Sequence, residues 1–227
     1  MCGRFTIISD PVAFQLEFDL PIAESRQPDW QPHYNVSPTQ QVPILDNARE
    51  RRIQWMQWGL LPVWAKEKKD SYRLINVRAE TILEKVTFRK LMQKGQRCLI
   101  LADGFYEWQA PAESKAPKTP FYFHLKARKP FAFAGLWDYS QLPDGQSAPT
   151  CAIITCAPNS LVSPVHNRMP VMLDAQRGWD WMSDQPAAQL LSLLQPFPAD
   201  EMEAYAVSPL VNSPASDAPE CILPAEN

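Results

Sequence analysis

The second residue of the chain is a cysteine, within the opening sequence MCGRF. Removal of Met1, which is usual when the second residue is small, leaves a thiol and an α-amine on one residue. An amine with a pKa of about 7.7 is partly neutral at physiological pH, and a thiol with a pKa of about 8.5 is partly thiolate. Together they can capture an aldehyde, because the amine forms a Schiff base and the sulfur then closes a five-membered thiazolidine ring.

Two other interpretations of Cys2 stay open at this point. A mature N-terminal cysteine can act as the nucleophile of an amidohydrolase, with its own amine as the base. Alternatively, Met1 stays in place and Cys2 is a half-buried residue that opens the first strand, since cysteine often behaves as a small hydrophobe.

The segment SYRLINVRAET (residues 71–81) carries Asn76, Arg78 and Glu80 at alternating positions. Alternation puts these polar groups on one face of an extended segment. Asparagine offers a donor and an acceptor together, and arginine fits phosphate oxygens with its two-pronged donor set. In the simpler interpretation, Arg78 and Glu80 are a surface ion pair and Asn76 caps the following helix.

Glu107 lies between Tyr106 and Trp108 in the segment ADGFYEWQ, directly after an apolar run. A carboxyl group enclosed by aromatic rings has a raised pKa and can serve as a general acid or base near neutral pH. Strand alternation favours another arrangement, with Glu107 on the solvent face and Trp108 in the core.

His166 precedes Arg168 by two residues in PVHNRMPVML, where flanking prolines indicate a rigid loop. Imidazole is suited to move protons at neutral pH, although a structural histidine remains possible. Pro38 and Trp64 belong to a group of prolines and aromatic residues beside a basic run, which suits base stacking above a phosphate track. Core packing accounts equally well for Trp58.

The charge distribution is uneven although the net charge is only −3. From Arg49 to Arg97 the chain has 13 Lys or Arg against 5 Asp or Glu, a net charge of +8, and the remainder carries −11. Such asymmetry can create a local anion-binding face on an acidic protein. Alternatively, many of these lysines simply lie on the solvent-exposed faces of helices.

The remaining patterns predict a single α+β domain dominated by antiparallel strands. Helices are expected from Pro11 to Phe18 with Asp10 as N-cap, and within Arg78–Lys94 and Arg177–Gln195. Strands are expected at residues 2–8, 42–45, 52–58, 97–101, 105–109, 120–126, 130–137 and 151–156. Loops are expected at residues 21–41 and 109–119, a turn at residues 143–145, and a loose tail after Pro214.

The cysteines and the apolar runs argue against several classes of protein. The five cysteines contain no Cys-x-x-Cys pair, and only three histidines accompany them, so neither a zinc site nor a disulfide framework is expected. No secretory signal or membrane-spanning run is evident. We expect a cytoplasmic protein with free thiols and no metal or cofactor.

Seven motifs, in their order along the chain, resemble the SOS-response-associated peptidase (SRAP) domain family. They are MCGRF, YNVSPT, WGLLPVW, INVRAET, CLILADGFYEW, HNRMP and AVSPLVNSP. The combination of an N-terminal MCGRF with GFYEW and H-x-RMP is highly specific. The resemblance implies a barrel-like sheet with a few flanking helices, residues 2–213 as the domain and residues 214–227 as a C-terminal tail.

The resemblance also implies a chemistry. After removal of Met1, Cys2 forms a thiazolidine with the ring-opened sugar of an abasic site in single-stranded DNA, and the crosslink protects the lesion. Asn76 then orients the amine, Glu107 serves as acid and base in crosslink formation and slow reversal, and His166 assists ring opening and reversal. The residues expected to hold phosphates are Arg4, Arg78, Arg168 and, more weakly, Thr155; those expected to pack against bases or block the opposite strand are Pro38, Trp64 and Trp108.

The expected partner is therefore single-stranded DNA containing abasic sites. We expect a monomer that needs no cofactor, contacts no membrane, lies on the nucleoid when bound and meets replication-fork proteins there. Two other function classes stay open: a Cys2-dependent thiol autopeptidase or amidohydrolase, and a non-covalent module that binds single strands.

Overall fold

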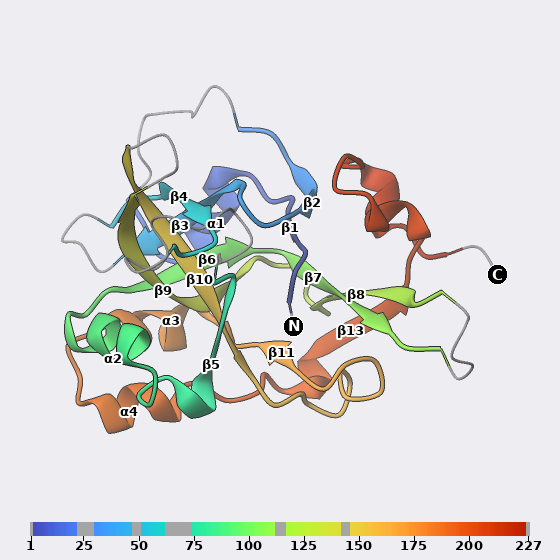
Figure 1. Cartoon of the computed structure of the whole chain (residues 1–227). Helices are drawn as coiled ribbons and strands as arrows, with labels where there is room; N and C mark the ends of the chain where they lie inside the picture. The colour runs from blue at the N-terminus through green and yellow to red at the C-terminus, as the bar shows by residue number, and fades with distance from the viewer. Residues whose placement is uncertain are drawn as a thin grey trace.

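The computed structural model describes residues 2–21, 30–46, 51–61, 74–111, 117–141 and 146–225. Two β-sheets form the body of the molecule, with helices around them (Figure 1). The five-stranded sheet has the order β13-β8-β7-β1-β2. Its strands are β1 (Phe5–Ile7), β2 (His33–Val36), β7 (Gly104–Gln109), β8 (Thr119–Leu125) and β13 (Met202–Ala206).

The second sheet closes into a barrel, because its pairings return to the strand from which they start. β10 pairs with β4, β4 with β3, β3 with β6, β6 with β9, and β9 again with β10. The strands of this sheet are β3 (Gln41–Asp46), β4 (Gln54–Trp58), β5 (Asn76–Arg78), β6 (Arg97–Ala102), β9 (Phe131–Gln141), β10 (Ser147–Cys156), β11 (Met169–Pro170) and β12 (Met172–Leu173). Among the described residues, only the pairings of β10 with β4 and β5 are parallel, so the predicted α+β class with mainly antiparallel strands is confirmed.

Short helices surround the sheets. The α-helices are α1 (Pro11–Glu17), α2 (Val86–Gln93), α3 (Ala175–Met182) and α4 (Ala187–Ser192). The 3-10 helices are η3 (Ala79–Thr81), η4 (Ala199–Glu201), η5 (Pro209–Asn212) and η6 (Pro219–Ile222). Within the described ranges, no helix has the length and apolar character needed to cross a membrane.

Phe5 of β1 joins the two sheets by aromatic packing. Its ring centre lies 5.0 Å from that of Trp58 on β4 and 5.5 Å from that of Phe133 on β9, both in edge-on geometry. All three side chains are fully buried. Burial of one such ring contributes about 1.5–3 kcal/mol, and each edge-on pair adds about 0.5–1.5 kcal/mol. This packing holds β1, and with it the N-terminal residues, between the five-stranded sheet and the barrel.

Most of the expected elements are present, and the differences come from long-range pairing. Every expected strand overlaps an observed one, and the N-cap is confirmed because the N–H of Ala13 donates to Oδ1 of Asp10 at 2.8 Å. The loop expected at residues 21–41 is wrong at residues 33–36, where β2 pairs with β1. The helical stretch expected from Arg78 contains only η3 and α2, since Arg78 itself ends β5, which pairs with β10. The turn at residues 143–145 and the centre of the 109–119 loop lie outside the described residues.

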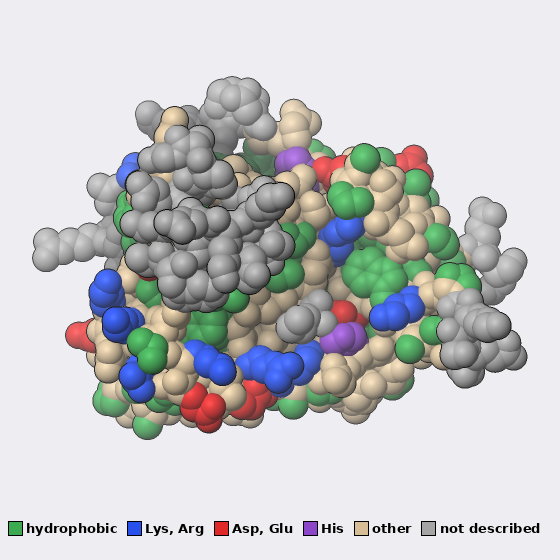
Figure 2. All heavy atoms as spheres, viewed as in Figure 1, with side chains coloured by type: hydrophobic (Ala, Val, Ile, Leu, Met, Phe, Trp, Pro, Cys, Tyr) green, Lys and Arg blue, Asp and Glu red, His purple; other side chains and the backbone are tan. Residues whose placement is uncertain are grey.

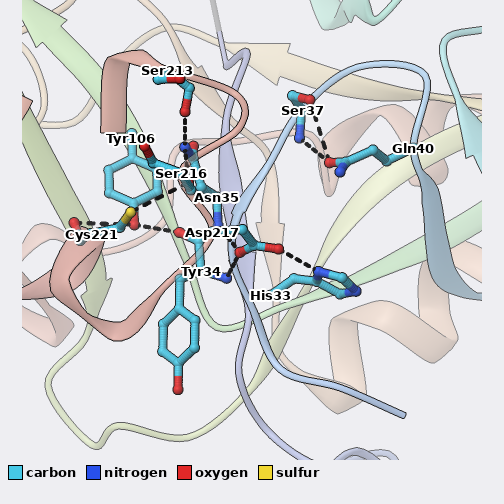
Figure 3. Close-up of polar contacts among 10 residues, drawn as sticks. All are labelled: His33, Tyr34, Asn35, Ser37, Gln40, Tyr106, Ser213, Ser216, Asp217 and Cys221. Atoms are coloured by element: carbon cyan, nitrogen blue, oxygen red, sulfur yellow. Dashed lines mark hydrogen bonds and ion pairs between the residues drawn. The ribbon is translucent and has the colours of Figure 1, made fainter. Parts of the chain in front are cut away.

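The chain beyond Pro214 is not the loose tail that the sequence predicts (Figure 3). The carboxylate of Asp217 accepts hydrogen bonds from the main-chain N–H groups of Tyr34 and Asn35, and it lies 2.7 Å from Nδ1 of His33. These three residues belong to β2, the edge strand of its sheet. An edge strand exposes main-chain groups that need partners. The segment beyond Pro214 supplies these partners through Asp217 and therefore packs on β2.

Replacement of Asp217 by alanine is expected to lower the free energy of unfolding by about 1–3 kcal/mol, because two main-chain donors lose their acceptor. Glu220→Ala, which removes an exposed carboxylate from the same segment, is expected to change it by less than about 0.5 kcal/mol. Urea unfolding followed by tryptophan fluorescence measures both. Equal stabilities of the two variants would contradict a stabilising contact between the C-terminal segment and β2.

Candidate active site

Cys2 lies three residues before β1 and is buried in the interior of the molecule, near the dark-blue end of the chain in Figure 1. The residue has no exposed surface, and its Sγ is 3.8 Å from the carbonyl oxygen of Arg4. Burial, together with the nearby carboxylate of Glu107, raises the pKa of the Cys2 thiol far above its ordinary value. The fold therefore holds Cys2 as a neutral thiol beside an acidic group.

Asn76 begins β5 and binds the main chain of Cys2. Its Nδ2 donates to the carbonyl oxygen of Cys2 at 2.8 Å. The position of Asn76 is set by parallel pairing of β5 with β10, where Asn76 lies opposite Ile153. Its Oδ1 is buried and has no hydrogen-bond donor in the described part of the chain. The side chain of Asn76, which holds the main chain of Cys2, thus keeps one acceptor that no described residue uses.

Glu107 lies on β7 on the same face as Phe105, since side chains two apart share a face of a strand. Phe105 packs at 6.3 Å from Phe133 of the barrel, and Glu107 is only 2% exposed. Tyr106 and Trp108 point to the opposite face. The alternative arrangement, with Glu107 in solvent and Trp108 in the core, is therefore wrong. Burial raises the pKa of the Glu107 carboxyl to about 7.

His166 lies on the loop between β10 and β11 and faces Glu107. Its Nε2 is 3.8 Å from Oε2 of Glu107. Its Nδ1 lies 3.1 Å from the main-chain nitrogen of Arg168 and 3.2 Å from the carbonyl oxygen of the same residue, so the main chain of Arg168 fixes the ring of His166 on the side away from Glu107. Burial lowers the pKa of His166 while it raises that of Glu107. The two groups therefore form an acid–base pair that can exchange a proton near neutral pH.

The structure thus brings together the four residues expected to be catalytic: Cys2, Asn76, Glu107 and His166. They come from the N-terminus, β5, β7 and a loop, and the set combines a nucleophilic residue, an amide anchor and an acid–base pair. Such a set suits addition to a carbonyl carbon, in which protons must move on and off oxygen, nitrogen and sulfur. No three His, Cys, Asp or Glu side chains among the described residues are grouped so as to hold a metal ion.

Basic side chains lie on one side of this cluster. Figure 2 shows Lys and Arg side chains in a row over α2 and β5, on the face that also displays the N-terminal region. Arg78 is exposed at the end of β5, opposite Thr155 on β10. Nη2 of Arg168 donates to the carbonyl oxygen of Thr155 at 2.6 Å. Thr155 itself is fully buried, so its side chain can influence a ligand only through Arg168.

Arg4 follows Cys2 by two residues, and hydrogen bonds to the protein fix its guanidinium group. Its Nη1 donates to Oδ1 of Asn35 at 2.9 Å and to the carbonyl oxygen of Val211 at 2.8 Å. Asn35 is buried, and its Nδ2 donates to main-chain carbonyl groups of the C-terminal segment, among them Ser213 and Ser216 in Figure 3. Asn35 therefore ties the guanidinium group of Arg4 to the folded C-terminal segment.

The residues expected to pack against bases differ in their structural environment. Trp108 is partly exposed, and its Nε1 donates to Oδ1 of Asn212 at 2.7 Å. Pro38 is partly exposed in the turn between β2 and β3, two residues beyond Val36, which pairs with Phe5. Trp64 lies outside the described residues.

Comparison with known proteins shows the family to which the chain belongs. Residues 1–214 match the family described as "SOS response associated peptidase (SRAP)". The chain belongs to the SRAP family. The match confirms the resemblance that the seven motifs indicate.

Relatives of this SRAP chain cover nearly its whole length. "Abasic site processing protein YoqW" of Bacillus subtilis (strain 168) is 43% identical over 229 residues, which are 98% of this chain and 99% of the relative. "Abasic site processing protein HMCES" of Mus musculus is 30% identical over 273 residues, with 100% of this chain and 76% of the relative covered. A crystal structure of a protein from Bacteroides thetaiotaomicron has a TM-score of 0.83 at 28% identity, covering 99% of this chain and 100% of that one.

Sequence reasoning did not single out Asn35 and Asn212 of this SRAP domain. Their only signal was membership of the motifs YNVSPT and AVSPLVNSP. Neither motif shows by itself that Asn35 holds Arg4 or that Asn212 holds Trp108, because both contacts join segments far apart in the chain.

Glu107→Gln in this SRAP domain is expected to remove a pH dependence of stability. The pKa of Glu107 rises from its ordinary value of 4.5 to about 7 on folding, so the folded protein binds this proton more tightly than the unfolded chain does. The contribution of this proton to the free energy of unfolding is therefore present in full below about pH 4.5 and is lost as the pH rises through about 7. Its size is about 3 kcal/mol.

Urea unfolding at about pH 5 and about pH 8 tests this pH dependence. Glu107→Gln, which cannot ionise, is expected to lose less stability than the wild type between the two pH values. Glu220→Gln, a change at an exposed carboxylate, is expected to follow the wild type. A wild-type profile in Glu107→Gln would show that Glu107 does not titrate in this range.

Proposed function

We propose that this SRAP protein processes abasic sites in single-stranded DNA by forming a thiazolidine link between Cys2 and the ring-opened sugar. The observation that carries the proposal is the buried contact of Cys2 with Asn76 beside the Glu107–His166 pair. The names of the relatives YoqW and HMCES, both abasic site processing proteins, support the same substrate. The proposal requires removal of Met1, because an amide nitrogen cannot form a Schiff base.

The proposed reaction needs no oxidant or reductant. The α-amine of Cys2 adds to the aldehyde carbon of the opened sugar, and loss of one water molecule gives an imine. Sγ then adds to the imine carbon while the thiol proton passes to nitrogen, which closes the five-membered ring. Reversal follows the same steps backwards, with water as the final reactant.

The side chains of the site have distinct roles in this proposal. Asn76 holds the main chain of Cys2, and its unpartnered Oδ1 is the acceptor that we assign to the α-amine. Glu107 carries the proton transfers at the imine and the thiol, since it lies close enough to Cys2 to raise the pKa of the thiol. His166, whose side chain is 26% exposed, assists opening of the sugar ring.

Binding of the strand is assigned to groups around the cluster. Arg4, Arg78 and Arg168 hold phosphates on the two sides of the lesion, which makes binding dependent on salt but indifferent to base sequence. Trp108 and Pro38, with Trp64, pack against neighbouring bases. We further propose residues 2–213 as the SRAP domain and residues 214–227 as a C-terminal tail, of which Asp217 contacts β2, since the family match ends at residue 214.

A single-stranded oligonucleotide with one abasic site is expected to give a heat-stable shifted band with the wild-type protein on a denaturing gel. Cys2→Ala keeps an amine but lacks the sulfur, so it is expected to give only an imine that must be trapped with borohydride. Cys98→Ala, a change at a buried cysteine on β6, is the matched control and should crosslink like the wild type.

Two outcomes of this experiment would contradict the proposal. One is the absence of a stable band with wild-type protein from which Met1 has been removed. The other is a stable band with Cys2→Ala without reductant. Equal affinity for abasic and intact strands together with no crosslink would instead indicate a non-covalent binding module.

The family description contains a second activity for Cys2, that of a peptidase. We place it second because burial keeps the thiol neutral, and a neutral thiol is a weak nucleophile toward an amide. When methionine aminopeptidase is inhibited during expression, wild type, Cys2→Ala and Glu107→Gln are all expected to retain Met1 by intact mass. Loss of Met1 in the wild type alone would show self-processing.

A further inference from the structure

Arg168, to which we assign a DNA phosphate, is already bound to a carboxylate. Its Nη1 and Nη2 donate to the two carboxylate oxygens of Glu80 at 2.7 Å and 2.9 Å. Nη2 also donates to the carbonyl oxygen of Thr155 at 2.6 Å. The Arg168 side chain is 14% exposed, whereas that of Glu80 is 49% exposed. Glu80 therefore covers the guanidinium group from the solvent side.

The donors of Arg168 can be assigned one by one, since a guanidinium group has five N–H bonds. Glu80 and Thr155 use both hydrogens of Nη2, and Glu80 uses one of Nη1. Nε is buried without a partner in the described part of the chain, where a ligand from solvent does not reach it. One N–H of Nη1 remains for a phosphate, so a two-pronged phosphate contact requires that Glu80 leave.

The carboxylate of Glu80 occupies the position that a phosphate would take. Carboxylate and phosphate both accept two parallel hydrogen bonds from arginine. The hydrogen bond from Arg168 lowers the pKa of Glu80, and the positive charge of Arg78 adds to this effect, so the carboxylate lies near two of the proposed phosphate ligands. Glu80 also borders a surface cavity of about 240 Å³ lined in part by Cys156 and Leu191, which leaves its side chain room to rotate.

We propose that Glu80 competes with a DNA phosphate for Arg168 and thereby limits the affinity of the site for intact single strands. A bound strand displaces the carboxylate, while Thr155 keeps the arginine in place. Because non-covalent binding is weak, the covalent step at the aldehyde determines which strand is retained. The inference rests on the proposed function and adds a residue that sets selectivity for abasic over intact DNA.

Glu80→Gln tests the competition with a fluorescent oligonucleotide that contains no abasic site. The variant is expected to bind about fivefold more tightly than the wild type near 0.1 M salt, because one more phosphate contact forms. The slope of log K against log salt concentration is expected to steepen by about 0.7, the value for one added contact on a single strand. In a competition between abasic and intact strands, the variant is expected to show a lower selectivity for the abasic strand than the wild type does.

Two variants show whether the effect belongs to Arg168. Glu84→Gln removes the same charge from an exposed position four residues further along and is expected to leave the salt slope unchanged. In an Arg168→Gln background, Glu80→Gln is expected to give no gain. Thermal unfolding of each variant confirms that it is folded.

The competition and the proposed function can fail separately. Weaker binding by Glu80→Gln would overturn the competition and show that Glu80 positions Arg168 instead. An equal gain in Glu84→Gln would overturn it in favour of a general charge effect. A wild-type protein that does not crosslink to abasic DNA would overturn the proposed function, and the affinity of the variants for intact strands would still be measurable.

Discussion

Burial of Phe5 between Trp58 and Phe133 is the contact on which the site depends, because it holds an end of the chain inside the molecule. Chain ends usually fray, since few contacts offset the entropy lost when they are ordered. Here β1 is paired on both sides, with β2 and β7, and the ring of its first residue, Phe5, is packed against the barrel. Cys2, three residues before Phe5, is consequently held at a fixed place beside Asn76.

The position of β7 beside β1 also determines which of its side chains are buried and which are partly exposed. Alternation along β7 turns Glu107 toward the barrel, where burial raises its pKa to about 7, and turns Trp108 to the opposite face. On that face η5 supplies the partners: Asn212 binds Trp108, and Val211 binds Arg4. In the proposed mechanism, proton transfer is therefore assigned to a buried carboxyl group, and Trp108, which is assigned to the strand of DNA, is partly exposed.

The uneven distribution of charge explains how an acidic protein can bind a polyanion. The basic residues are concentrated between Arg49 and Arg97, and the described ones lie largely on β5, α2 and the start of β6. Glu80 lies within this basic segment and binds Arg168. A carboxylate between arginines lowers non-specific attraction without removing the arginines, which is consistent with our proposal that a covalent bond rather than charge retains the protein on DNA.

The sequence by itself determined the family, the α+β class, the strands β1, β3, β4 and β6–β10, the cap of α1 and the identity of the candidate site residues. These features are encoded locally, in motifs and in the spacing of apolar residues. Only the tertiary structure decided that β2 forms, that β5 pairs in parallel with β10, that Glu107 is buried, and that the chain after Pro214 packs through Asp217. Each of these depends on contacts between segments far apart in the chain, and a local pattern cannot specify which distant strand or carboxylate will supply the partner.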